Sequence, residues 1–294
     1  MRILICSDGM PAADNATRIG GILAAACGAE TTLLGIAENP VDEQPLREAV
    51  EAQAELLKSS GVTPRIVIGS GEPIREILDQ TSTSNYDLVV IGSRRTRTTG
   101  LHWRSEKTYE VIKAIPVPVL VAVGECEQLK RFLVCTGGKR FIDDAVRLTG
   151  TIAAAVGASV TLLHVMAEPP AIYADLVRLE EDLDRLLKSG SELGRNLVRQ
   201  KKDLAALGIP VEVRVRHGDV VEQIFAEAHA GHHDLIVTGS SQAQGALRHY
   251  IMGDLSRTVL NRADCPVLVA RSGASRPAVN LFASFKRLFG VRGG

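Results

Sequence analysis

One strand-like stretch occurs twice in the chain, first as Asp87-Leu88-Val89-Val90-Ile91-Gly92-Ser93 and again as Asp234-Leu235-Ile236-Val237-Thr238-Gly239-Ser240. Each copy is a run of apolar, mostly β-branched residues that closes on Gly-Ser. Near-continuous apolarity, without alternation of apolar and polar residues, is typical of a strand covered on both faces of a parallel sheet. The two copies lie 147 residues apart, so the sequence predicts a duplicated α/β domain.

The repeat extends outward from these stretches over most of the chain. Residues 2–34 align with residues 131–163 at an offset of 129. Residues 118–122 reappear unchanged as residues 266–270. The offset grows from 129 to 147 between the second and third predicted strands, so the second copy is 18 residues longer there.

Short apolar runs predict five strands in each copy, with helical patterns such as 11–27 and 73–82 between them. The predicted strands are 3–7, 31–37, 65–69, 88–92 and 117–123, then 132–136, 159–166, 211–216, 235–239 and 267–270. Alternating strands and helices predict a parallel sheet with right-handed crossovers. The fold class is therefore α/β, with two doubly wound domains, each a five-stranded parallel sheet with helices on both faces. We expect the strand order 3-2-1-4-5 in each.

The predicted organisation has four parts. They are a first domain at 1–124, a linker at 125–130, a second domain at 131–271 and a C-terminal tail at 272–294. The stretch 172–207 is predicted to be an amphipathic cover helix that bends or breaks at Gly190 or Gly194.

Composition excludes several classes of protein. The 294 residues carry 34 Lys+Arg and 34 Asp+Glu, so the basic excess of a duplex-DNA binder is absent. Aromatic residues make up only 4%, which leaves little surface for stacking single-stranded bases. The five cysteines form no CxxC motif and predict free thiols in a reducing, cytoplasmic location, with Cys126 in the linker as the most exposed thiol.

One uncharged stretch, 148–167, is long enough to cross a bilayer. Its counterpart in the first copy carries Glu30 in its middle. A buried helix followed by a buried strand is therefore favoured over a membrane span. The pair His232-His233 lies beside Asp234 but near no other metal ligand, which favours a polar loop over a metal site.

A ligand in such a sheet binds beyond the carboxyl ends of the strands, where the strand order reverses. With the order 3-2-1-4-5, that place lies between the first and fourth strands of each copy. The glycines that follow the fourth strand of the second copy are suited to binding phosphate through backbone N–H groups, together with the start of the next helix.

These repeated motifs, Asp-Leu-Val/Ile-Val-x-Gly-Ser and Pro-Val-Leu-Val-Ala, and the opening Ile3-Leu4-Ile5-Cys6-Ser7-Asp8-Gly9 resemble those of a tandem universal stress protein. The resemblance implies that each domain pairs with its copy through the last strand, as a pseudo-dimer. Some members of that family bind ATP through Gly-x-x-Gly, nine residues, then Gly-Ser/Thr, and through an aspartate after the first strand. The residues indicated as ligand-binding are Asp8, Gly9, Ile36, Gly92, Ser93, Arg94 and Arg95 in the first copy, and Gly137, Gly138, Val165, Gly239, Ser240, Gly245, Gly253 and Ser256 in the second.

Both copies depart from the ATP pattern. In the first, Arg95 stands where the second glycine belongs, and Ser105-Glu106 stands where Gly-Ser belongs. In the second, Gln242 replaces the second glycine, Asp254 replaces the Ser/Thr, and Gly137 replaces the aspartate. An acidic side chain at the phosphate end repels phosphate, at a cost of a few kcal/mol in a partly dry site.

Two segments have competing interpretations. The basic cluster 94–107 around Trp103 either grips an anion with side-chain cations or is a solvated loop. The tail carries four basic and no acidic residues and an apolar stripe at helical spacing. It docks on its own chain or on a protein partner, or it lies on an anionic membrane surface.

Three functions are compatible with these features. The first is a stress-response protein that binds a small anion or an adenine nucleotide such as ATP, without catalytic or metal-binding residues. The second is an ATP-binding protein with weak hydrolysis. The third is an adaptor with degenerate sites. Pairing of the two domains is expected in all three. The sequence is compatible with both a monomer and a homodimer of the whole chain.

Overall fold

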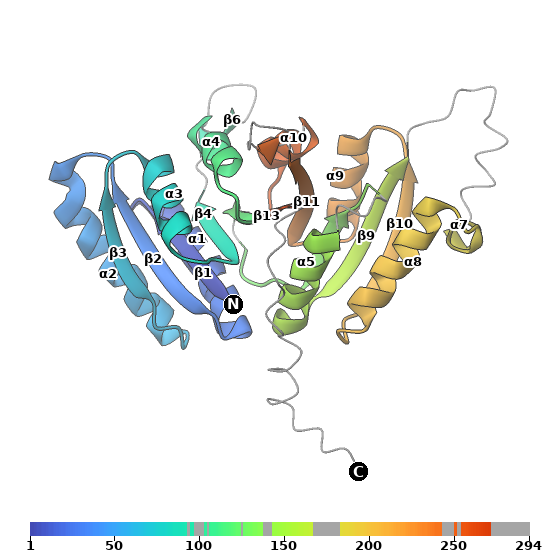
Figure 1. Ribbon diagram of the computed structural model, residues 1–294, viewed down its shortest axis with the longest axis horizontal. Coiled ribbons are helices and arrows are strands. Elements are labelled where there is room, and N and C mark those ends of the chain that lie inside the picture. Colours follow the sequence, from blue (N-terminus) through green and yellow to red (C-terminus); the bar gives the residue numbers. More distant parts are fainter. Residues whose placement is uncertain are drawn as a thin grey trace, which may run out of the picture.

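The computed structural model describes residues 1–92, 95–96, 103–104, 106–124, 126–137, 143–166, 183–242, 250–251 and 254–271. One continuous sheet runs through both halves of the molecule (Figure 1). The strands of the first half are β1 (Arg2–Ser7), β2 (Glu30–Ala37), β3 (Arg65–Ser70), β4 (Leu88–Gly92) and β7 (Val119–Ala122). Those of the second half are β8 (Arg131–Cys135), β9 (Ser159–Met166), β10 (Val211–His217), β11 (Leu235–Gln242) and β13 (Val267–Arg271).

The strand order is β3-β2-β1-β4-β7-β13-β11-β8-β9-β10. Each half therefore has the predicted order 3-2-1-4-5 with parallel pairing. The halves meet where β7 pairs antiparallel with β13, with Leu120 opposite Leu268. These strands derive from the identical stretches 118–122 and 266–270, so the pairing expected from the resemblance is confirmed.

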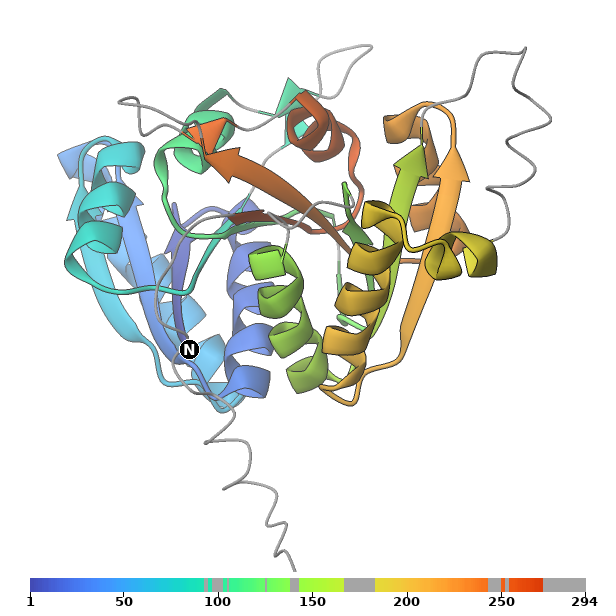
Figure 2. The ribbon, with the colours of Figure 1, turned by 45° about the vertical axis from the view of Figure 1, so that its right-hand side comes forward.

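Helices cover both faces of the sheet. The helices of the first half are α1 (Pro11–Cys27), α2 (Glu43–Ser59), α3 (Pro73–Thr83) and α4 (Glu106–Ala114), and a short 3-10 turn, η1 (Pro40–Asp42), precedes α2. Those of the second half are α5 (Asp143–Val156), α7 (Leu183–Lys188), α8 (Glu192–Ala205), α9 (Val220–Ala230) and α10 (Asp254–Arg262). In Figure 2, α1 and α5 lie side by side on one face, and they are in contact.

Two apolar clusters fill the space on either side of the sheet, and each contains residues of both domains. One cluster includes Ile19 of α1 and Leu197 of α8, and the other includes Ile112 of α4 and Val259 of α10. Burial of apolar surface is the main force that stabilises such layers. Because each cluster crosses the β7–β13 junction, the two domains share their cores.

Local sequence explains where the helices begin and end. Helix α1 has Pro11 in its first turn, and Gly28 ends it in the left-handed conformation with φ +55°. Helix α9 begins at the cap Asp219, whose side chain accepts a hydrogen bond from the backbone N–H of Glu222 at 2.9 Å. The predicted helix over 11–27 is thus confirmed at both ends.

The predicted cover helix of the second half breaks at Gly190. This residue has φ +66°, and the next residue, Ser191, caps α8 by accepting a hydrogen bond from the N–H of Gly194. Gly194 itself lies inside α8, where a Cβ would collide with the carbonyl oxygen of Leu186 in α7. Residues 167–182 of this stretch lie outside the described residues.

The uncharged stretch 148–167 folds, as far as residue 166, as the end of α5 followed by β9, as expected. Among the helices that the structure describes, none has the length and apolar character of a membrane span. The predicted tail, 272–294, lies outside the described residues, so its docking stays a prediction.

The expectation of an exposed Cys126 is wrong. Its side chain is buried, and its Sγ lies 3.0 Å from the carbonyl oxygen of Gln128. Cys126 and Leu129 are buried, whereas Glu127, Gln128 and Lys130 are exposed, and α1 binds the backbone before and at Cys126. Asn15 donates to the carbonyl oxygen of Gly124, and Arg18 donates to that of Cys126.

Candidate functional site

The first domain has a cleft at the carboxyl ends of β1 and β4, where the strand order reverses. These two strands pair directly, with Cys6 opposite Ile91. The cleft has a volume of about 600 Å³. It is lined by Cys6, Ser7, Asp8, Gly9, Met10, Ile36, Ala37, Glu38, Asn39, Asp42, Pro45, Leu46, Pro73, Ile77, Ile91, Gly92 and Val111. Four predicted residues, Asp8, Gly9, Ile36 and Gly92, are therefore brought together.

The turn after β1 presents Asp8 at the rim of the cleft. Its side chain is exposed, and its Oδ1 accepts a hydrogen bond from the N–H of Met10 at 3.0 Å, at the start of α1. Gly9 has φ +71°, and a Cβ there would lie 3.0 Å from Leu46 Cδ1 of α2. A residue without a side chain is thus suited to this turn.

The floor of the cleft is apolar. Ile36 of β2, Ile77 of α3 and Ile91 of β4 are all buried there, and Val111 of α4 closes one side. Such a floor offers dispersion contacts and water exclusion to a flat apolar group. A purine ring is one group of this kind.

The rim is acidic. Besides Asp8, the lining contains Glu38 and Asp42, which follow the carboxyl end of β2. Asn39 Nδ2 donates to Asp42 Oδ2 at 3.2 Å. The described lining contains no Lys or Arg. Sequence reasoning missed these two acids, although their position directly after the second predicted strand was a signal that could have found them.

The segment after Gly92 is described only in part. Ser93 and Arg94 lie outside the described residues, as do Gly138, Gly245 and Gly253. The backbone of Arg95 belongs to a small hairpin of β5 (Arg95–Thr96) and β6 (Trp103–Arg104). The prediction that the basic cluster grips an anion therefore stays a prediction.

The second domain arranges the equivalent place differently. Gly137 follows β8 where Asp8 follows β1, and among the described residues beyond its chain neighbours, no atom lies within 4 Å of a Cβ built on it. The preceding Thr136 is buried, and its Oγ1 donates to Gln200 Oε1 at 3.2 Å. The carbonyl oxygen of Thr136 accepts from His164 Nδ1 at 2.8 Å. The side chains here bond to one another, and the carboxylate of the first domain has no counterpart.

Gly239, Ser240, Val165 and Ser256 occupy the expected elements of the second domain. The backbone of Gly239 and Ser240 continues β11, which extends to Gln242 and pairs antiparallel with β12 (Tyr250–Ile251). Buried Ser256 in α10 donates to the carbonyl oxygen of Gly239 at 3.3 Å. Val165 in β9 packs against the apolar cluster that also contains the cleft floor of the first domain.

An Asp–Gln pair joins α1 to α2 in the first domain and α5 to α8 in the second. Gln53 Nε2 donates to Asp14 Oδ1 at 2.8 Å in the first domain. In the second, Gln200 Nε2 lies 3.3 Å from Asp143 Oδ1, and Arg199 adds two bonds to the same carboxylate at 2.6 and 3.0 Å. The hydrogen bond with Asp143 is the main cause of the raised pKa of Arg199.

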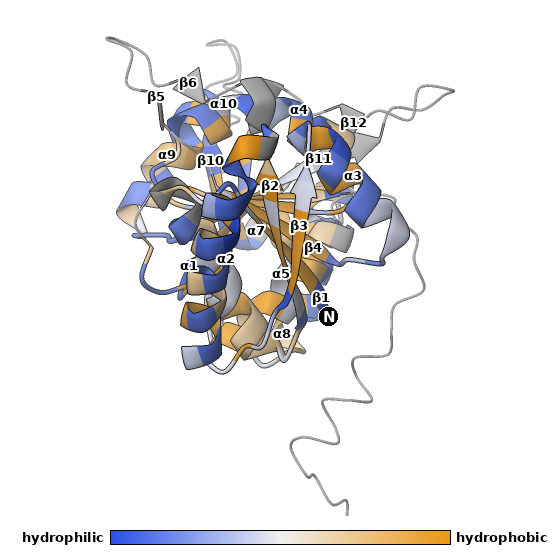
Figure 3. Ribbon diagram, turned by 90° about the vertical axis from the view of Figure 1, so that its left-hand side faces the viewer, coloured by the Kyte–Doolittle hydropathy of each residue, from blue (hydrophilic) through white to orange (hydrophobic). Residues whose placement is uncertain are grey.

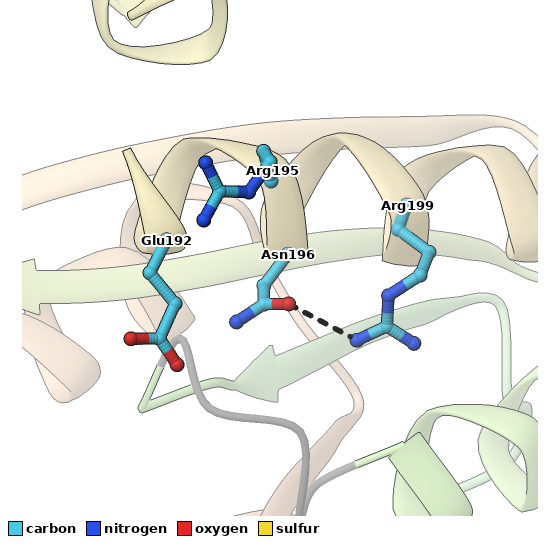
Figure 4. Close-up of a pocket in the computed structure, with 4 residues that line it drawn as sticks. All are labelled: Glu192, Arg195, Asn196 and Arg199. Carbon is cyan, nitrogen blue, oxygen red and sulfur yellow. Dashed lines mark hydrogen bonds between the residues drawn. The ribbon is translucent and has the colours of Figure 1, made fainter. Parts of the chain in front are cut away.

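A second cavity of about 430 Å³ lies on α8 beside this network (Figure 4). It is lined by Glu192, Arg195, Asn196 and Arg199. Arg199 also donates to Asn196 Oδ1 at 3.3 Å, and Arg195 donates to the carbonyl oxygen of Gly190. Among the described residues, the lining and the neighbouring Asp143 together carry two acids and two guanidinium groups.

The two histidines before β11 do not form a metal site in the described structure. His233 Nε2 lies 3.0 Å from Thr161 Oγ1, and its Nδ1 lies 3.2 Å from the carbonyl oxygen of Glu227. Burial is the main cause of the lowered pKa of His233. Across the part of the chain that the structure describes, no three His, Cys, Asp or Glu side chains gather as metal ligands.

Thiol chemistry gives a first testable prediction. Burial raises the pKa of Cys6, at the edge of the cleft, and of Cys135 to about 12, and it also raises that of Cys126. The thiolate is the reactive form, so at about pH 8 Cys6 and Cys135 are almost entirely unreactive, and Cys126 reacts more slowly than an exposed thiol. We expect an aromatic disulfide reagent to label the native protein slowly, and to label all five free cysteines rapidly in guanidinium chloride. Fast labelling of native Cys126 would show that the linker opens.

Comparisons with known proteins agree with this architecture. A family model described as the universal stress protein family matches residues 1–122 and 128–271. A universal stress protein from Archaeoglobus fulgidus DSM 4304 has 18% identity, covering 92% of this chain and 98% of its own, with a TM-score of 0.64. A protein from Pseudomonas aeruginosa UCBPP-PA14 has 13% identity, with coverage of 98% and 96% and a TM-score of 0.63.

A search of curated proteins finds no match. A universal stress protein in complex with cAMP covers only 50% of this chain, with 22% identity and a TM-score of 0.35, which is too low to bear on the ligand here. The two family matches account for both halves of the continuous sheet. The chain belongs to the universal stress protein family, with two domains of that family in tandem.

Proposed function

We propose that this chain is a stress-response protein that binds a small anionic ligand, an adenine nucleotide being the first to test, in the cleft of the first domain. The observation that carries the proposal is the cleft of about 600 Å³ with an apolar floor and Asp8 at its rim. Pockets of this size at the switch point of an α/β sheet are ordinary sites for small ligands.

The lining favours one orientation of a nucleotide. The apolar floor of Ile36, Ile77 and Ile91 suits the base, and an exposed carboxylate such as Asp8 accepts hydrogen bonds from hydroxyl or amino groups. Three acids at the rim repel phosphate. The phosphate groups would therefore point away from the described lining, toward the segment after Gly92, where the sequence carries Arg94 and Arg95.

The first domain is the better candidate of the two. Gly137 provides no carboxylate in the second domain, and Thr136 is engaged with Gln200 and His164. A ligand that depends on the Asp8 carboxylate would bind only to the first domain. We propose one principal site per chain, in a protein of the cytoplasm.

The proposal is tested by releasing and measuring nucleotide. Purified protein is denatured and the supernatant is analysed by mass spectrometry, with ATP titration by calorimetry in parallel. Asp8→Ala is expected to weaken ATP binding at least about tenfold, because hydrogen bonds to a charged group contribute about 1.5–3 kcal/mol. Asp79→Ala is the matched control, since Asp79 is an exposed acid of α3 outside the cleft lining.

Each outcome has a definite consequence. If Asp8→Ala and Asp79→Ala bind ATP with equal affinity, the ligand does not depend on Asp8 at the rim of the cleft. If mass spectrometry finds no released nucleotide and calorimetry measures no heat of ATP binding, ATP is excluded as the ligand and an adaptor role is favoured. We propose binding without chemistry of its own, so phosphate release that Asp8→Ala abolishes would instead favour weak ATP hydrolysis.

A further inference from the structure

Each domain carries a small antiparallel hairpin beyond its fourth strand. In the first domain β5 pairs with β6, with Arg95 opposite Arg104. In the second, the end of β11 pairs with β12, with Gln242 opposite Tyr250. The two hairpins occupy equivalent positions in the repeat, and each precedes a helix, α4 or α10, of its own domain.

The hairpins cross between the domains. Strand β6 of the first domain contacts α10 of the second, and β12 of the second contacts α4 of the first. Figure 3 shows this exchange, with β6 beside α10 and β12 beside α4. Each helix thus packs against the hairpin that belongs to the other domain.

Side chains join the two helices directly. Tyr109 of α4 is buried, and its hydroxyl donates to Asn261 Oδ1 of α10. The guanidinium of Arg257 lies 5.2 Å from the centre of the Tyr109 ring, a distance at which cation–π attraction operates. From β13, the buried Arg271 donates to the carbonyl oxygen of Ile112, in the last turn of α4.

The same two helices reach both ligand positions. Val111 of α4 lines the cleft of the first domain, between Tyr109 and Ile112 in sequence. Ser256 of α10 bonds the carbonyl oxygen of Gly239 at the equivalent place in the second domain, next to Arg257. The contacts between α4 and α10 therefore join a residue that lines the first cleft to a residue that supports the equivalent place in the second domain.

We propose that α4 and α10, with the crossed hairpins, couple the two domains, so that a ligand in the cleft of the first domain changes the packing at the equivalent place in the second, and a change in the second domain alters affinity in the first. This regulation rests on the proposed function for its ligand, but the mechanical link exists without one. Coupling of this kind is reciprocal, and in proteins it typically changes affinity by about 5- to 150-fold.

The test uses two neighbouring residues of α10 in the full-length protein. Asn261→Ala removes the contact with Tyr109. Arg262→Ala is the matched control, because Arg262 stays within its own domain, 2.6 Å from Glu222 and 4.7 Å from the centre of the Phe225 ring. Tyr109→Phe is the milder second variant, since it deletes only the donating hydroxyl and keeps the ring under Arg257.

The first readout is amide hydrogen exchange without ligand. Asn261→Ala and Tyr109→Phe are expected to speed exchange in α4 and the β5–β6 hairpin at least about threefold, and Arg262→Ala is expected to leave them unchanged. The emission of Trp103 in β6, the only tryptophan in the sequence, gives an independent signal. Equal exchange in all four proteins, or equal acceleration by the control, would overturn the coupling.

The second readout is ATP affinity by calorimetry. Asn261→Ala is expected to change it about threefold or more, and Arg262→Ala is expected not to. If ATP binds the parent protein and both variants equally, the coupling fails while the proposed function stands. If ATP does not bind at all, the proposed nucleotide function fails, and the exchange measurement alone decides whether the helices are linked.

Discussion

Leu120→Asp is expected to lower the free energy of unfolding by about 5 kcal/mol or more, the largest effect that we predict for a single substitution. Leu120 is fully buried in β7 and faces Leu268 of β13 where the domains join. The change removes about 2 kcal/mol of apolar burial and places an unpaired polar group in the shared core, at a further cost of about 2–7 kcal/mol. Thermal unfolding by calorimetry, with the yield of soluble protein, measures the loss.

The matched control is Leu56→Asp. Leu56 lies on α2 with 62% of its surface exposed, so the same chemical change is expected to shift stability by less than about 0.5 kcal/mol. Because each apolar cluster contains residues of both domains, we expect Leu120→Asp to destabilise the two domains together. An unfolding profile in which one domain keeps its normal transition would contradict the shared core.

Gly124→Ala is the second large effect, with an expected cost of about 3 kcal/mol or more. Gly124, shortly after β7, has φ +66°, a conformation that costs about 1–2 kcal/mol for a residue with a side chain. A Cβ would also overlap the carbonyl oxygen of Asp264, which is backbone and has little freedom to move aside. The clash would push apart the linker and the residues that lead into β13.

Gly28→Ala separates these two causes. Gly28 has φ +55°, but no atom lies within 4 Å of a Cβ built on it, so only the conformational cost applies. Denaturant unfolding of the two variants should show Gly124→Ala to be less stable than Gly28→Ala by about 2 kcal/mol. Equal losses would mean that the linker adjusts around Asp264 without cost.

Much of the fold could be predicted from local patterns. Apolar runs located all ten main strands to within a few residues, and Pro11 and Gly28 marked the ends of α1. The expected strand order holds in both copies, and the identical stretches 118–122 and 266–270 became the strands that join the domains. These features can be recognised in the sequence because burial of a strand or helix determines which positions of a short segment are apolar.

The site was predicted only in part. Asp8, Gly9, Ile36 and Gly92 meet because all four lie at carboxyl ends of strands or in the turn that follows one, and parallel strands bring those ends to one edge. Glu38 and Asp42 were missed although they follow the second predicted strand, and Val111 was missed because it reaches the cleft only through the way α4 folds over that edge.

By itself, the sequence determined the duplication, the positions of the strands and helices, and four of the residues that line the cleft. Tertiary structure decided which side chains meet across elements that are distant in the chain. It buried Cys126, paired Asp143 with Arg199, and joined Tyr109 to Asn261 across the two domains. Such contacts leave no period in the sequence, because they depend on how whole layers pack and not on the alternation of neighbouring residues.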